Sequence, residues 1–87
     1  MSDLHDEVRR GAEASQLLAN PILVEAFAKV EARIIAEWRA AAASDVEHQR
    51  NLLMLLKALD KVRGYLTQTA HTGKMASLEL AQKRGTE

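Results

Sequence analysis

Apolar residues recur three and four positions apart along nearly the whole chain, and no segment alternates apolar and polar residues as a half-buried strand does. This spacing gathers apolar side chains on one face of an α-helix. Alanine, leucine, glutamate and arginine are frequent, and all four favour helix. The sequence therefore predicts an all-α protein: an antiparallel hairpin of two long helices, with an N-terminal helix and a short C-terminal helical tail.

Two local signals mark where the first and second helices begin. Ser2 or Asp3 can cap the first helix, because a side-chain oxygen there accepts a hydrogen bond from a free amide of the first turn. Asn20 precedes a proline, which disfavours helical backbone at that position, and the Asn–Pro pair supplies a cap and a first residue for the next helix. We therefore expect helices over residues 3–19 and 21–43.

The remaining boundaries follow from a capping box and a glycine. Ser44 and Glu47 have the spacing at which the two side chains cap each other's backbone amides. They predict a third helix over residues 45–72, which Gly73 would end as a left-handed cap. A weaker helical tail is expected over residues 75–84. No linker divides the 87 residues, so the chain is predicted to be a single domain.

Each predicted helix has one apolar face. The face of the first helix contains small residues, among them Gly11, so this helix can lie close to a neighbour but buries little area. The faces of the two long helices are formed by Leu23, Phe27, Val30, Ile34, Trp38 and Ala41, and by Leu52, Leu55, Leu56, Leu59, Val62 and Leu66.

Some apolar residues fall outside these faces, and a chain of this length buries only a modest core. Leu53 and Met54 lie off the main seam, and Trp38 ends the apolar face of the second helix. Tryptophan is enriched at interface centres. We therefore expect these three residues to contact a partner, most simply a second copy of the chain in a homo-oligomer, or another protein.

Gly64 lies inside a predicted helix, where glycine costs about 1 kcal/mol relative to alanine. The apolar face continues on both sides of it, so a helix end at Gly64 is not expected. A glycine at this position would allow another segment to lie close, with Tyr65 beside it. We predict a contact at Gly64 and Tyr65, made either by the first helix or by another subunit.

Charge is balanced overall but divided between the halves of the chain. Lys plus Arg and Asp plus Glu number 12 each. Residues 1–48 hold five basic and nine acidic residues, and residues 49–87 hold seven and three, so the net charges are −4 and +4. Folding the halves together would pair these charges. Alternatively, a basic stripe of Arg50, Lys57 and Lys61 could meet an anionic partner such as nucleic acid.

Catalytic and cofactor signatures are not found. The chain has no cysteine, no glycine-framed serine and no phosphate-binding loop. Asp45 and His48 have the spacing of two metal ligands on one helix, but a helix-capping role is the simpler interpretation. We expect no enzyme activity, no cofactor and no metal. No apolar run is long enough to cross a membrane, so no membrane partner is expected.

A set of residues spread over Leu17 to Lys74 resembles a group of small uncharacterised helical proteins encoded by tailed bacteriophages. The residues that carry the resemblance are Asn20-Pro21, Phe27, Trp38, Leu59-Asp60, Arg63-Gly64 and Gly73-Lys74. The resemblance implies a phage accessory protein that is located in the virion or in the cytoplasm of the bacterial host. It transfers no functional residues.

These observations favour a non-enzymatic protein that acts by protein–protein contact, as a small virion component or assembly factor. Two alternatives remain. One is a phage-encoded inhibitor that binds a host defence or regulatory protein. The other is a nucleic-acid-binding accessory factor for packaging, although a net charge of zero and only three aromatic residues disfavour it.

Overall fold

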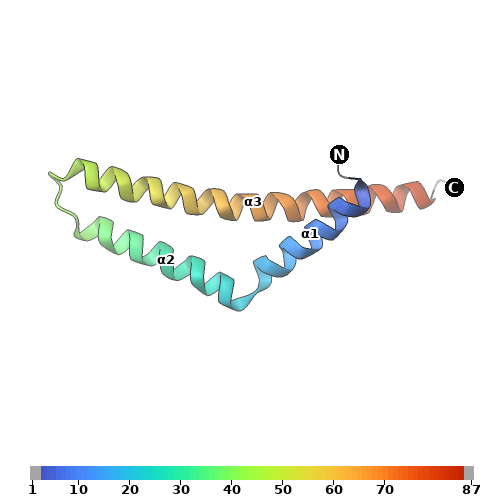
Figure 1. Ribbon diagram of the computed structural model, residues 1–87, viewed down its shortest axis with the longest axis horizontal. Coiled ribbons are helices and arrows are strands. Elements are labelled where there is room, and N and C mark those ends of the chain that lie inside the picture. The colour runs from blue at the N-terminus through green and yellow to red at the C-terminus, as the bar shows by residue number, and fades with distance from the viewer. Residues whose placement is uncertain (1–2, 86–87) are drawn as a thin grey trace.

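A computed structural model describes residues 3–85 and contains three α-helices. They are α1 (Leu4–Ala19), α2 (Pro21–Ala40) and α3 (Val46–Gly85). No strand occurs in residues 3–85, so the predicted all-α class is confirmed. The three helices outline a triangle in which α3 forms the long side (Figure 1).

The first two helix starts follow the predicted local chemistry. The Asp3 side chain accepts a hydrogen bond of 2.8 Å from the Asp6 amide and caps α1. Ser2 lies outside the described residues. Asn20 caps α2, with Oδ1 accepting from the amides of Ile22 at 2.9 Å and Leu23 at 3.2 Å. The elbow between α1 and α2 is therefore a cap in which Pro21 occupies the first helical position.

The connection between α2 and α3 differs from the prediction. α2 ends at Ala40 rather than at residue 43, and α3 is capped by Asp45, whose carboxylate accepts from the His48 amide at 3.2 Å. The predicted capping box at Ser44 is therefore wrong by one residue. A carboxylate is as good a cap as a hydroxyl and also interacts favourably with the helix dipole. The Gln49 side chain donates to the Ala42 carbonyl at 2.9 Å and ties the loop to α3.

α3 is one continuous helix of 40 residues, so the predicted end at residue 72 and the separate tail over 75–84 are wrong. Gly73 is not a left-handed cap, because none of the described glycines has a positive φ. It lies inside the helix and is buried. Glycine at this position lets α3 pack closely against α1, and the backbone of α3 stays helical across it.

That packing is a crossing of α1 and α3 at two glycines. A Cβ atom placed on Gly11 would lie 2.5 Å from the Gly73 Cα, and one placed on Gly73 would lie 2.8 Å from the Glu7 carbonyl oxygen. Ala14 and Ala76, also small, are buried beside the crossing at 4% and 3% exposure. The expectation that the first helix lies close to a neighbour is confirmed, and only glycine allows this approach.

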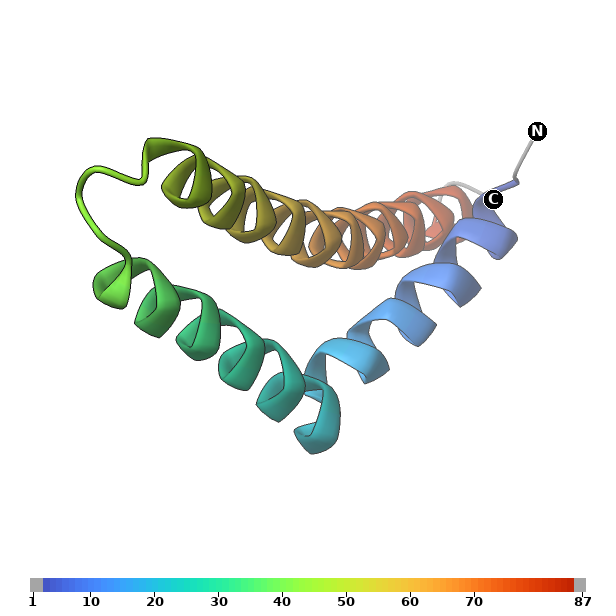
Figure 2. The same ribbon diagram turned by 60° about the vertical axis from the view of Figure 1, so that its left-hand side comes forward.

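α2 returns from the elbow toward the start of α3 (Figure 2). The two helices run in opposite directions, and they diverge from their connecting loop toward Asn20. Close packing along all of α2, as a regular hairpin requires, stays a prediction. The open arrangement gives a Cα radius of gyration of 18.6 Å, against about 12 Å for a compact chain of this length.

The glycine crossing predicts opposite effects for the same substitution at different glycines. Gly11→Ala and Gly73→Ala should each destabilise the fold by about 1–3 kcal/mol, because the new methyl group meets backbone that cannot rotate away. Gly64→Ala should stabilise it by about 0.5–1 kcal/mol, because a Cβ at residue 64 meets nothing within 4 Å. Urea unfolding at one fixed protein concentration measures all three variants. Equal effects at the three positions would contradict the crossing.

Candidate protein interaction surface

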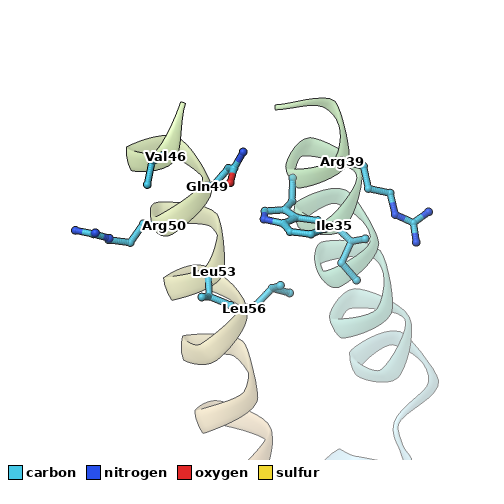
Figure 3. Close-up of a pocket in the computed structure, with 8 residues that line it drawn as sticks. Ile35, Arg39, Val46, Gln49, Arg50, Leu53 and Leu56 are labelled. Atoms are coloured by element: carbon cyan, nitrogen blue, oxygen red, sulfur yellow. The ribbon is translucent and has the colours of Figure 1, made fainter. Parts of the chain in front are cut away.

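An apolar groove lies between the C-terminal half of α2 and the start of α3. Its volume is about 560 Å³. α2 contributes Ile35 and Trp38, α3 contributes Val46, Leu53 and Leu56, and the polar edge consists of Arg39, Gln49 and Arg50. Figure 3 shows Leu56 directed into the space between the two helices, with Arg39 and Arg50 pointing outward on either side. We call these eight residues the α2–α3 groove.

The groove is apolar because the chain has few places to bury its apolar side chains. In residues 3–85 the buried apolar side chains are Ala14, Ile34, Leu52 and Ala76. Trp38 and Leu53 remain 51% and 50% exposed on the walls of the groove. Exposed apolar side chains that cluster at one site favour a contact surface more than single ones do.

The structure brings two of the five predicted interaction residues together. Trp38 and Leu53 line the groove from opposite helices, whereas Met54 does not line it. Met54 is 61% exposed elsewhere on α3, because successive helix positions are about 100° apart. Whether any of these three side chains binds a partner stays a prediction.

Gly64 and Tyr65 have different surroundings. Of the two predicted origins for a contact at Gly64, the first helix is excluded, because no atom lies within 4 Å of a Cβ built there. A contact from another subunit stays a prediction. Tyr65 does meet the first helix: its hydroxyl accepts a hydrogen bond of 3.0 Å from the Arg10 guanidinium.

Part of the predicted apolar seam faces solvent. Leu55, Val62 and Val30 were expected in the interface of the two long helices but are 54%, 53% and 48% exposed. α2 diverges from α3, so only the centre of the seam, at Ile34 and Leu52, is buried. One edge of the seam is therefore open to solvent.

Arg63 pairs charge between the two halves of the chain. Its guanidinium donates to the Glu31 carboxylate at 2.7 Å and lies 5.2 Å from the centroid of the Phe27 ring. This arginine joins α2 to α3 by a cation–π contact and an ion pair. Arg63 was not predicted from the sequence to join the helices. Its position seven residues after Leu56, on the apolar face of α3, was the available signal.

The basic stripe has no such pairing. Arg50, Lys57 and Lys61 are exposed on the side of α3 opposite the buried Leu52. Within residues 3–85 none of the three forms an ion pair. The acid Glu25 of α2 pairs instead with Lys29 of its own helix, at 2.9 Å.

Asp45 and His48 do not converge as ligands, because the Asp45 carboxylate is engaged with the His48 backbone amide. No group of three potential metal-binding side chains occurs in residues 3–85. In the same range, no helix combines the length and the apolar character that a membrane span requires.

The Arg63 arrangement predicts measurable coupling between α2 and α3. A double-mutant cycle with Glu31→Gln and Arg63→Met should give a coupling free energy of about 0.5–1 kcal/mol, discounted for side chains that are 37% exposed. The control is a cycle with Glu13→Gln and Arg9→Met within α1, where both side chains are 61% exposed. That pair should give no more than about 0.5 kcal/mol. A larger coupling in the control cycle would argue against an interhelix role for Arg63.

Comparison with known proteins adds no family to this description. The chain matches no protein-family model, and comparisons with curated proteins and with solved structures found no match.

Proposed function

We propose that this chain is a non-enzymatic protein that acts by protein–protein contact through the α2–α3 groove. The observation that carries the proposal is a tryptophan and a leucine, each about half exposed, facing one apolar groove of about 560 Å³. Aromatic and arginine side chains dominate the binding energy of many interfaces, and the groove is lined by Trp38 and edged by Arg39 and Arg50.

Apolar area left in water at the groove favours binding of a partner. Covering a side chain such as Trp38 or Leu53 gains about 25 cal/mol for each Å² removed from solvent. A groove already formed by two helices loses little conformational entropy when a partner binds, so more of this gain contributes to affinity. A preformed apolar groove is therefore better suited to binding a helix or loop of a partner than to chemistry on a small substrate.

The biological setting that we propose comes from the sequence resemblance. Because the chain resembles small helical proteins of tailed bacteriophages, we propose a phage accessory role, as a virion component or assembly factor, in the particle or in the host cytoplasm. An inhibitor of a host defence or regulatory protein would use the same groove, so the identity of the captured protein distinguishes the two roles.

This proposal is tested with a variant that carries a photo-crosslinking amino acid in place of Leu53. The variant is produced in bacteria that replicate the phage encoding the chain. We expect a crosslink to a phage structural or assembly protein, identified by mass spectrometry, together with the chain itself in particles purified on a gradient. The same crosslinker at Gln16, exposed on α1, is the control. A stoichiometric crosslink to a host protein would overturn the assembly role in favour of inhibition. No crosslink above the Gln16 control would overturn the contact function.

A second candidate function rests on the unpaired basic stripe. Three exposed cations on one side of α3 can contact phosphate groups, and they support an anionic partner such as packaged DNA. If this role holds, DNA binding measured at low salt should weaken steeply as salt is added. Lys57→Gln with Lys61→Gln should reduce both the affinity and the salt slope, whereas Lys29→Gln on α2 should not. An unchanged affinity in the double variant would refute this role.

A further inference from the structure

We infer that the outer face of α2, which contains Ala32, Ala36 and Arg39 and adjoins the α2–α3 groove, is covered by a second copy of this chain, with the two α2 helices packed antiparallel about a two-fold axis. This inference rests on the proposed contact function and deepens it by naming one partner and the register in which it binds.

The chain exposes more surface than a compact monomer of the same mass. Its accessible surface is 6890 Å², whereas a folded monomer of 9.6 kDa is expected to expose about 5,100 Å². The excess of about 1,800 Å² is more than twice the roughly 800 Å² that one partner buries in a standard interface. The chain therefore has ample surface for a stable dimer. Because its own core is small, a dimer would bury apolar side chains that the monomer leaves in water.

The groove extends over the outer side of α2. A second hollow is lined by Ala32, Ile35, Ala36, Arg39 and Ala40, so Ile35 and Arg39 belong to both hollows. The alanines separating the two ends of α2 are small enough to let another helix approach at the short end of the usual 8–10 Å interaxial range. The occupant that fits this continuous surface is an elongated helix.

Charge on α2 points to α2 itself as that helix. Glu25, Ala32 and Arg39 are separated by heptad intervals, so they lie on one face of the helix. The acid is at one end of this face and the base is at the other. Glu25 also pairs with Lys29 of its own helix at 2.9 Å, an exposed contact that a carboxylate can share with a second cation. In an antiparallel pair centred on Ala32, Glu25 of each copy lies opposite Arg39 of the other copy, and two ion pairs form. A parallel pair would place like charges opposite each other.

The same register brings an exposed apolar residue to the second copy. Val24 lies beside Glu25 and is 52% exposed. When Glu25 lies opposite Arg39 of the other copy, Val24 is level with Ala40 of that copy, which lines the second hollow. The arrangement is self-complementary, because each copy contributes one Val24 and one Ala40. This is the requirement for an isologous two-fold interface.

The register is tested with a single introduced cysteine, which is unambiguous because the chain has none. Residue 32 meets its own counterpart on the two-fold axis, so Ala32→Cys should form a disulfide-linked dimer on mild oxidation. Ala26→Cys is the matched control: it is an exposed alanine of the same helix, on another side. Crosslinking of Ala26→Cys but not of Ala32→Cys, or of both equally, would overturn the proposed register.

Charge reversal tests the ion pairs in solution. The unmodified chain should have a mass by light scattering of twice 9.6 kDa. Glu25→Arg alone and Arg39→Glu alone should each raise the dimer dissociation constant about tenfold, through two lost ion pairs and new repulsion. A mixture of the two variants should recover a dimer, because each heterodimer again pairs opposite charges at both sites. Arg33→Glu, on another side of α2, should have little effect. Variants that stay weak when mixed would overturn the pairing.

Failure of the second-copy inference can be distinguished from failure of the proposed contact function. The oxidation and light-scattering measurements use the purified chain alone, whereas the crosslinking experiment of the proposed function is made in cells. A strictly monomeric chain at all concentrations overturns the second-copy inference. If such a chain still crosslinks through residue 53 to one other protein, the contact function stands and the groove belongs to that protein.

Discussion

The fold depends on a close backbone contact between α1 and α3. Gly11 and Gly73 approach so nearly that an added methyl group on either would lie 2.5 Å from the other's Cα. This contact fixes where the first helix crosses the third and therefore where the elbow at Asn20 lies. Since the elbow sets the origin of α2, the crossing also decides how far α2 diverges from α3, and thus how much apolar surface stays open.

The small side chains that permit the crossing are also the reason for the small core. Glycine and alanine bring two helices together but remove little apolar area from water. The remaining large side chains are distributed along α2 and the first half of α3, where one ion pair and one cation–π contact at Arg63 provide the specific links. A chain arranged in this way has one well-packed end, at the crossing, and one end that exposes the α2–α3 groove.

The sequence allowed the helical class and the first two helix starts to be predicted, because these depend on neighbouring residues. Asp3 and Asn20 cap helices through amides two or three positions away. The continuity of α3 was missed, because a glycine near a helix end is locally indistinguishable from one buried at a crossing. Only the position of Gly11 in space decides between the two roles for Gly73. Of the groove, Trp38 and Leu53 were predicted individually, but their convergence depends on the elbow and the loop together.

The length of α3 has a consequence for any assembly built on α2. A helix of 40 residues spans about 60 Å, nearly the full 66 Å extent of the molecule. The crossing with α1 lies toward one end of this rod, and the α2–α3 groove lies at the other. In an antiparallel pair joined through α2, the two crossings would therefore face away from each other at opposite ends. Such a particle would be a spacer with two equivalent tips, able to connect two identical sites at a separation set by helix length.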